Sequence, residues 1–225
     1  LNVYNKPAHS AFEPGSVRVD DGVRQGDAIS PYYDSMIAKL IVHGATRQEA
    51  LAKLDRALAQ TQIVGLATNV QFLRHVLSSA SFSQARLDTA LIQREEQTLF
   101  FQEKLPLARA VSAQVAHVLI AESALQSADP FSRRDGFRAY GLATRRFEWV
   151  WQDARVDGVL TYLHDGARHL SISSGAQKVE GLLACERAGE AMVVHFGGDR
   201  FEAVVHTEIH ENGLLAHVFT AQGAT

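Results

Sequence analysis

The feature that most constrains the fold is a helical stretch with almost no polar face, running from Leu107 to about Gln126. Valine, leucine, isoleucine and alanine fill most of its positions. Four strongly polar residues interrupt them, namely Arg109, Gln114, His117 and Glu122. A helix that is apolar nearly all round has to be covered on every side. A membrane is a poor cover for a segment with four polar residues and many alanines. We therefore predict a helix enclosed by protein.

The rest of the chain supplies a cover. From about Phe137 onward, eight strand-like runs are separated by turn signals, with no further helical pattern. Most of the turn dipeptides are typical of hairpins. They are Asp157-Gly158, Asp165-Gly166, Ser174-Gly175, Ala188-Gly189, Gly197-Gly198 and Asn212-Gly213. Eight antiparallel strands can close into a barrel whose interior is filled by side chains. We predict an eight-stranded antiparallel β-barrel around a central α-helix.

The first hundred residues mix strands and helices, so the predicted fold class of the whole chain is α+β. Residues 17–29 contain two turn signals that suggest short antiparallel strands, and residues 36–42 form a mostly apolar strand. Three helices are expected, with caps at Thr46, Asn69 and Asp88; the first is a capping box with Glu49 and runs to about residue 60. We place the boundary between two domains at residues 103 and 104.

Composition excludes several classes of protein. A net charge of −3 gives no general attraction to nucleic acid or anionic membranes. The single cysteine, Cys185, cannot form an internal disulfide, which fits a reducing compartment. We find no signal peptide and no run of about 18 apolar residues, so neither secretion nor membrane spanning is expected. The chain opens inside a strand-like pattern and ends in a linker-like one, so we expect a piece of a longer protein.

Two consecutive segments resemble a known family. Residues 17–27 read Val-Arg-Val-Asp-Asp-Gly-Val-Arg-Gln-Gly-Asp, and residues 29–41 read Ile-Ser-Pro-Tyr-Tyr-Asp-Ser-Met-Ile-Ala-Lys-Leu-Ile. Together they resemble the C-terminal lobe of biotin carboxylase, and the similarity runs from about residue 11 to residue 100. The sequence of residues 22–27, Gly-Val-Arg-Gln-Gly-Asp, most resembles the alpha subunit of 3-methylcrotonyl-CoA carboxylase. Propionyl-CoA and acetyl-CoA carboxylases are the near alternatives.

Residues 106–225 resemble, more loosely, the middle domain of those alpha subunits. The features that carry this resemblance are the apolar helix, Asp-Pro-Phe-Ser at residues 129–132 and Gly-Phe at residues 136–137. In the family this domain is a barrel around a helix that links the alpha subunit to the carboxyltransferase beta subunit. The implied partners are that beta subunit and the missing ATP-grasp and biotin-carrier domains, with no nucleic acid and no membrane. The implied location is the cytoplasm of a bacterium or the mitochondrial matrix of a eukaryote.

The resemblance also assigns roles to residues. Arg18 matches the family's active-site arginine, whose permanent charge would hold the ureido oxygen of biotin as negative charge develops there. The plain alternative is a surface arginine on a strand. Thr89 aligns near the adenine pocket. Tyr33 and Asp34 are interpreted as structural residues of the lobe's edge.

The intact enzyme implied by the resemblance uses biotin and ATP with magnesium. Nothing in these 225 residues resembles a Gly-rich phosphate loop or the metal-binding glutamates of an ATP-grasp domain. Residues 190–193, Glu-Ala-Met-Val, place valine where a biotinyl lysine would stand. We therefore expect the chain alone to be inactive and to bind none of these cofactors.

Three patterns suggest other functions. His206, Glu208 and His210 would share one face of a strand, but they extend over about 13 Å, too far for one tetrahedral metal ion. Arginines and aromatic residues alternate between residues 133 and 149, which suggests a nucleic-acid-binding barrel as the main rival function. A solvated rim or a protein-binding surface is favoured because the rest of the chain is acidic. Residues 197–199, Gly-Gly-Asp, are interpreted as a hairpin turn and not as a phosphate-binding loop. A purely structural scaffold is the third possible function of the chain.

Overall fold

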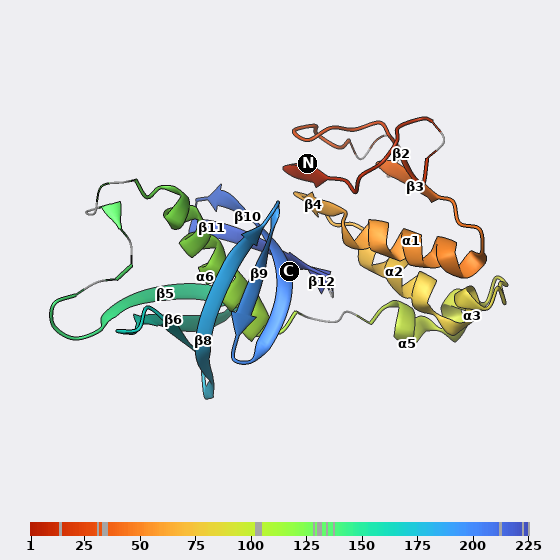
Figure 1. The fold of residues 1–225 in the computed structure, drawn as a ribbon. Coiled ribbons are helices and arrows are strands. Elements are labelled where there is room, and N and C mark those ends of the chain that lie inside the picture. The colour runs from red at the N-terminus through yellow and green to blue at the C-terminus, as the bar shows by residue number, and fades with distance from the viewer. Residues whose placement is uncertain are drawn as a thin grey trace. The chain divides into compact units, whose positions relative to one another are not determined.

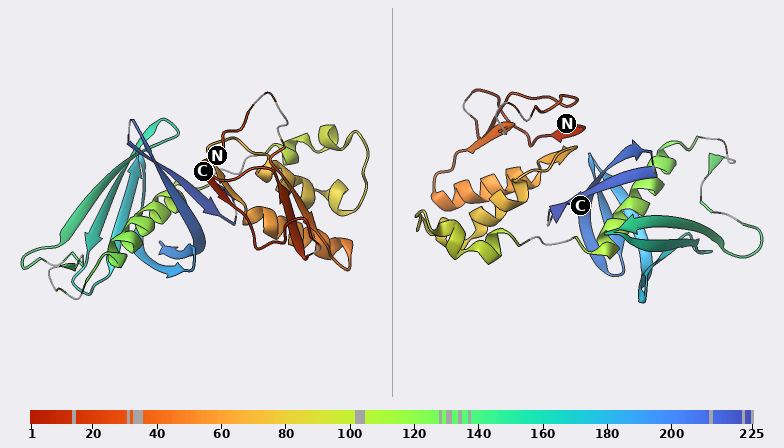
Figure 2. Two further views of the ribbon diagram at one scale, coloured as in Figure 1. Left: turned by 90° about the horizontal axis from the view of Figure 1, so that it is seen from above. Right: turned by 180° about the vertical axis from the view of Figure 1, so that it is seen from behind.

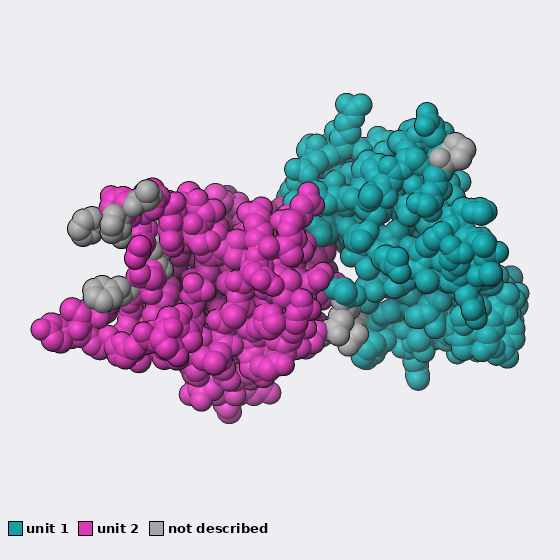
Figure 3. All heavy atoms as spheres, viewed as in Figure 1, with its two compact units in different colours: residues 1–103, 221–223 teal, residues 104–220, 224–225 magenta. Residues whose placement is uncertain are grey.

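The computed structural model describes residues 1–13, 15–30, 32, 36–101, 105–127, 129, 132–133, 135–136, 138–211, 213–221 and 223–224. Figures 1 and 2 show the fold from three sides. The chain divides into two compact units, which Figure 3 colours separately. Unit 1 comprises residues 1–103 with 221–223, and unit 2 comprises residues 104–220 with 224–225.

Unit 1 contains two small antiparallel sheets. Strand β1 (Val3–Asn5) pairs with β4 (Gln62–Val64), and β2 (Val17–Asp21) pairs with β3 (Ala38–Val42). Residues 17–29 were predicted to contain both strands of an antiparallel pair. That prediction is wrong, because the partner of β2 is β3. Val19 of β2 is buried and lies opposite Leu40 of β3, and residues 22–30 follow β2 as turns and loop.

Two helices of unit 1, α1 and α2, begin where the sequence predicts them, but their caps differ. In α1 (Arg47–Ala59), the Oγ1 of Thr46 accepts a hydrogen bond from the Glu49 N–H at 3.2 Å, as a capping box requires. Asn69 stands at the cap position of α2 (Val70–Ser78), but its side chain makes no capping bond. The remaining helices are single turns, namely α3 (Ala80–Ser83), α4 (Leu91–Arg94) and α5 (Glu96–Leu99).

Asp88 does not cap the helix that was predicted to follow it. Its carboxylate accepts the backbone N–H of Ala90 at 3.0 Å and pairs with Arg94 at 2.9 Å. Ala90 then takes the cap position, and Glu95 separates α4 from α5. The single helix expected after Asp88 is therefore two short ones.

The apolar helix of unit 2 is α6 (Leu107–Ala124). Every residue from Leu107 to Ile120 is buried or half-buried, and only the last turn is mostly exposed. The described helices include none that is long and apolar enough to cross a membrane. Residues of α6 belong to the buried core cluster of unit 2, so the protein itself covers this helix.

Eight strands form one sheet, in the order β12-β11-β10-β9-β8-β7-β6-β5. Consecutive strands are neighbours throughout, and the pairs from β5 to β11 are antiparallel. The strands are β5 (Ala143–Trp151), β6 (Ala154–Tyr162), β7 (Arg168–Ser174), β8 (Gln177–Ala188), β9 (Ala191–Phe196), β10 (Asp199–His210), β11 (Gly213–Thr220) and β12 (Gly223–Ala224). The mixed class and the eight-stranded antiparallel sheet are confirmed. The strand order is linear, with β5 and β12 at its ends.

Two long strands bend the sheet. Strand β8 pairs with β7 through residues 177–182 and with β9 through residues 183–188. Strand β10 likewise pairs with β9 and then with β11. Gly181 lies at the change of partner in β8, where a Cβ atom would stand 2.8 Å from the Cα of Gly197. Glycine is needed there because the two backbones approach so closely.

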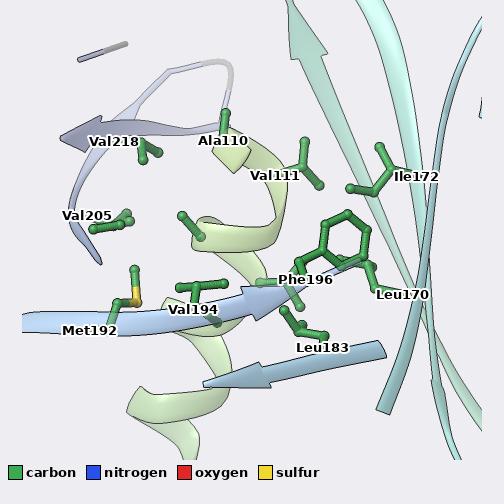
Figure 4. Close-up of a cluster of buried hydrophobic side chains, with 14 of the residues drawn as sticks. Ala110, Val111, Leu170, Ile172, Leu183, Met192, Val194, Phe196, Val205 and Val218 are labelled. Carbon is green, nitrogen blue, oxygen red and sulfur yellow. The ribbon is translucent and has the colours of Figure 1, made fainter. Parts of the chain in front are cut away.

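The core of unit 2 is built from alternate residues of successive strands. Val156 and Leu160 of β6, and Leu170 and Ile172 of β7, are at most 2% exposed. Figure 4 shows the cluster around α6, with Val111 of the helix among side chains from β7 to β11. Strands with a period of two residues place every second side chain on one face. The sheet thereby buries one face against α6.

The predicted turn at Asp157-Gly158 is wrong. Strands β5 and β6 turn instead at Gln152 and Asp153, whose φ angles of 49° and 64° are left-handed. Gly158 lies inside β6 opposite Phe147, and a Cβ atom on it would meet Cζ3 of Trp149 at 2.5 Å. The glycine is there to make room for an indole ring, and the sequence pattern alone does not distinguish this role from a turn.

Candidate functional site

Arg18 lies in the middle of β2, on the side that faces away from the buried residues of unit 1. Its neighbour Val19 is 2% exposed and points to the opposite side. The antiparallel register places Ile41 opposite Arg18 and Lys39 opposite Asp20. Directly opposite residues share a face of the sheet. We name the resulting group of Arg18, Asp20, Lys39 and Ile41 the ionic face.

Asp20 holds the guanidinium of Arg18. The Nε of Arg18 donates to both carboxylate oxygens, at 2.8 and 2.9 Å, and Nη2 donates to Oδ2 at 2.6 Å. This hydrogen-bonded pairing raises the pKa of Arg18 and lowers the pKa of Asp20. Both groups therefore stay charged at neutral pH. The ionic face carries two cations and one carboxylate, a balance that favours an anionic ligand.

The other side of β2 carries a separate polar cluster. Asp21 accepts a hydrogen bond from the Tyr4 hydroxyl at 2.9 Å and pairs with Lys6 at 2.7 Å. Burial raises the pKa of Tyr4, and its bond to Asp21 adds to that rise. Burial works against ionisation of Asp21, but the bonds from Lys6 and Tyr4 outweigh it and lower its pKa. These residues line a pocket of about 480 Å³ together with Phe12 and residues 22–25. Its groups satisfy one another, so the cluster is a structural support of β2.

Thr89 is exposed in the turn before α4. Between described residues, no hydrogen bond or ion pair connects Thr89 with the β2–β3 hairpin. The structure thus places the two residues singled out by the sequence on separate elements. Tyr33 and Asp34 lie outside the described residues.

The histidines of β10 are arranged differently from a metal site. The Oε2 of Glu208 lies 3.5 Å from Nε2 of His210 and 3.5 Å from Nε2 of His217. His217 stands opposite His206 across β10 and β11, a neighbour that the sequence pattern missed although the hairpin register implies it. Within the described ranges, no group of three His, Cys, Asp or Glu residues has the geometry to hold a metal ion.

Arg145 and two aromatic residues of β5 are engaged within unit 2, whereas Arg146 of the same strand is exposed. Arg145 donates to both oxygens of Glu122 at 2.8 Å, and its guanidinium lies 4.7 Å from the ring centroid of Phe147. Phe147 stacks on Trp149 with their planes 8° apart. A nucleic-acid interface needs such groups free for phosphates and bases. Their engagement with Glu122 and the core weakens that rival interpretation.

Two smaller interpretations are confirmed. Gly197 and Gly198 have positive φ angles and join β9 to β10 as a hairpin turn. Met192 and Val193 are buried in β9, as expected for strand residues. Sequence reasoning missed Asp20 as the partner of Arg18. The Arg-X-Asp spacing was a usable signal, because residues two apart in a strand share a face.

Comparison with known proteins identifies the first unit. A model of the biotin carboxylase C-terminal domain family matches residues 5–94. The mitochondrial methylcrotonoyl-CoA carboxylase subunit alpha of Arabidopsis thaliana is 42% identical over 112 residues, covering 50% of this chain and 15% of that protein. Its counterpart in Mus musculus is 32% identical over 180 residues, covering 76% of this chain and 25% of that protein. The biotin-dependent acyl-coenzyme A carboxylase alpha3 subunit of Mycobacterium leprae (strain TN) is 56% identical over 70 residues, covering 31% of this chain and 12% of that protein.

The relatives are therefore much longer than this chain, which spans a quarter or less of their length. The resemblance drawn from residues 17–41 is confirmed, because the family match includes all of them. The nucleic-acid-binding alternative gains no support from these relatives. Residues 5–94 therefore belong to the biotin carboxylase C-terminal domain family, and the chain as a whole is similar to alpha subunits of methylcrotonoyl-CoA carboxylase.

Proposed function

We propose that this chain is the part of an acyl-CoA carboxylase alpha subunit that completes the biotin carboxylase site and docks the carboxyltransferase. Residues 1–103 form the C-terminal lobe of biotin carboxylase, and residues 104–225 form the intersubunit domain. The acyl-CoA of the parent enzyme is 3-methylcrotonyl-CoA. The observation that carries the proposal is the position of Arg18, which lies within the family match and on the ionic face, with 34% of its side chain exposed.

The proposed role of Arg18 is to stabilise charge on biotin. Removing the proton from the ureido nitrogen pushes negative charge onto the ureido oxygen. A guanidinium keeps its own charge and offers several N–H donors in one plane. Asp20 occupies Nε and Nη2, which leaves the N–H groups of Nη1 for the ureido oxygen or for bicarbonate. Lys39, opposite Asp20, adds a second positive charge to the same face.

Activation of bicarbonate by ATP and magnesium is the chemistry supplied by the rest of the parent subunit, and we assign no step of it to this chain. Thr89 is proposed to border the adenine site, where its exposed hydroxyl is available to a ligand. We propose that residues 1–225 alone neither hydrolyse ATP nor carboxylate biotin. Bicarbonate-dependent phosphate release above a buffer blank would contradict this.

Unit 2 is proposed to bind the carboxyltransferase beta subunit. The curated relatives are alpha subunits, a name that implies a second kind of subunit, and unit 2 carries no part of the ionic face. We propose further that the eight strands close around α6 as a barrel. Burial of α6 from Leu107 to Ile120 and the change of partners along β8 and β10 support this architecture.

The test of the catalytic proposal is the carboxylation of free biotin by the full-length alpha subunit. Arg18→Gln should lower kcat by about 100-fold or more, roughly the cost of removing one oxyanion donor. Arg155→Gln is the matched control, because Arg155 of β6 also pairs with an aspartate two residues along its strand. The control should keep its rate. Equal rates in wild type and Arg18→Gln would make Arg18 an ordinary surface residue.

A further inference from the structure

Asp20 is anchored independently of the arginine that it holds. Besides its three contacts with Arg18, its Oδ1 accepts the backbone N–H of Phe12 at 3.0 Å. Only 17% of the Asp20 side chain is exposed, against 34% for Arg18. The carboxylate therefore bonds a backbone N–H in addition to the guanidinium of Arg18.

The segment that provides this backbone partner is itself tied to β2. The Ser10 N–H donates to the Val17 carbonyl at 3.0 Å, and the Val19 N–H donates to the Ser10 carbonyl at 3.0 Å. The Oγ of Ser10 also donates to the carbonyl of Glu13 at 2.9 Å. These bonds hold residues 10–13 alongside the strand. Phe12, with a φ of 56°, turns its N–H toward Asp20.

An arginine side chain that carries a reaction has to be ordered before the substrate arrives. A free arginine visits many rotamers, and ordering it during the reaction costs conformational entropy. A carboxylate that bonds Nε and Nη2 together fixes the guanidinium plane as well as its position. In the described part of the chain, the contacts of Arg18 side-chain nitrogens go to Asp20, through this one edge.

We propose that Asp20 is a positioning residue that fixes the guanidinium of Arg18 so that Nη1 is presented to the substrate. The inference rests on the proposed function, because it requires that Arg18 act on biotin. It adds a residue that touches no substrate and acts through Arg18 alone. The lowered pKa of Asp20 supports it, since the carboxylate remains ionised at neutral pH.

The test uses the full-length alpha subunit and the carboxylation of free biotin, with kcat and KM measured separately. Asp20→Asn should lower kcat by about tenfold, because a misplaced catalytic group loses rate steeply with small displacements. Asp20→Glu should recover most of the rate by restoring the carboxylate. Asp157→Asn is the matched control, because it removes the acceptor of the Arg155 pair in β6, and it should change nothing. Rates are referred to folded protein measured by circular dichroism.

A double variant separates positioning from a general structural role. If Asp20 acts through Arg18, then Arg18→Gln with Asp20→Asn should be no slower than Arg18→Gln alone. An additional tenfold loss in the double variant would overturn the proposal. A slow Arg18→Gln beside an unchanged Asp20→Asn would also overturn it and leave the function of Arg18 intact. An unchanged Arg18→Gln would instead refute the function on which it rests.

Discussion

The same short pattern, arginine followed two residues later by aspartate, occurs on a strand of each unit. In unit 1 the pair is Arg18 and Asp20, with side chains 34% and 17% exposed. In unit 2 it is Arg155 and Asp157, with side chains 67% and 47% exposed, and Arg155 is shared with Glu148. The pair in unit 1 is anchored by a backbone N–H from a separate segment. Spacing alone therefore does not distinguish an organised arginine from a solvated one.

The two units also differ in where their buried residues lie. Unit 2 concentrates its buried residues in one cluster around α6, whereas the buried residues of unit 1 are spread over its strands and helices, beside the ionic face. Removing apolar volume should therefore affect stability most in unit 2, and removing charge should affect chemistry most in unit 1. The predictions below test this division.

The largest effect on stability is expected at α6. Leu119 is 7% exposed inside the core cluster, whereas Leu125 at the end of the same helix is 73% exposed. Leu119→Ala should lower the free energy of unfolding by about 2–5 kcal/mol through lost burial and the cavity left behind. Leu125→Ala should change it by less than about 0.5 kcal/mol. Urea denaturation followed by circular dichroism measures both. Similar losses in the two variants would show that α6 is not enclosed.

A smaller loss is expected at Gly158. A Cβ atom at this position would stand 2.5 Å from the Trp149 ring, so Gly158→Ala should cost about 1–3 kcal/mol through overpacking. The matched glycine in unit 1 is Gly22, where an added Cβ atom meets nothing within 4 Å. Gly22→Ala should be close to neutral in the same denaturation experiment. A shift in tryptophan fluorescence confined to Gly158→Ala would locate the strain at Trp149, whereas two neutral variants would refute the close approach.

The smallest effect is a pH dependence confined to unit 2. Burial lowers the pKa of His117, with Arg187 adding to the shift. Burial also lowers the pKa of His206, which His217 and His117 reinforce and Glu190 opposes. The unfolded chain then binds protons more tightly than the folded one. The associated stability is present above the unfolded pKa of about 6.5 and is lost as the pH falls through it.

The measurement compares unfolding free energies at about pH 7.5 and about pH 5.5, on either side of the unfolded histidine pKa. His206→Gln should lose less stability on acidification than the wild type. His164→Gln, which changes an exposed histidine in the turn between β6 and β7, should behave like the wild type. An acid sensitivity that is the same in all three proteins would assign it to other groups.

The sequence predicted the elements whose signals are local. The apolar stretch from Leu107 predicted α6, and most Gly-containing turns of unit 2 fell where strands end. The failures come from contacts between distant residues. Gly158 makes room for Trp149, and the turn before β6 uses Gln152 and Asp153, neither of which is a glycine. The partner of β2 is β3, which begins 17 residues after β2 ends, and the turn signals within residues 17–29 do not indicate so distant a partner.

The sequence predicted only part of the candidate site, because contacts between residues far apart in the chain leave no local signal. Arg18 was identified from a resemblance between sequences, but its surroundings depend on tertiary structure. The bond from Phe12 to Asp20 requires a left-handed residue in a loop eight residues away, which no local pattern signals. His217 was missed because its proximity to Glu208 depends on the register of β10 and β11.

We propose that unit 1 serves the chemistry and unit 2 serves the assembly of one carboxylase. The most direct measurement is capture of the carboxyltransferase beta subunit by residues 104–225 alone, with circular dichroism of that piece as evidence of folding. Full-length alpha subunit with Arg18→Gln is the companion sample. We expect the folded piece to capture the beta subunit, and Arg18→Gln to capture it equally while carboxylating biotin about 100-fold more slowly. A folded piece with no affinity for the beta subunit would contradict the account.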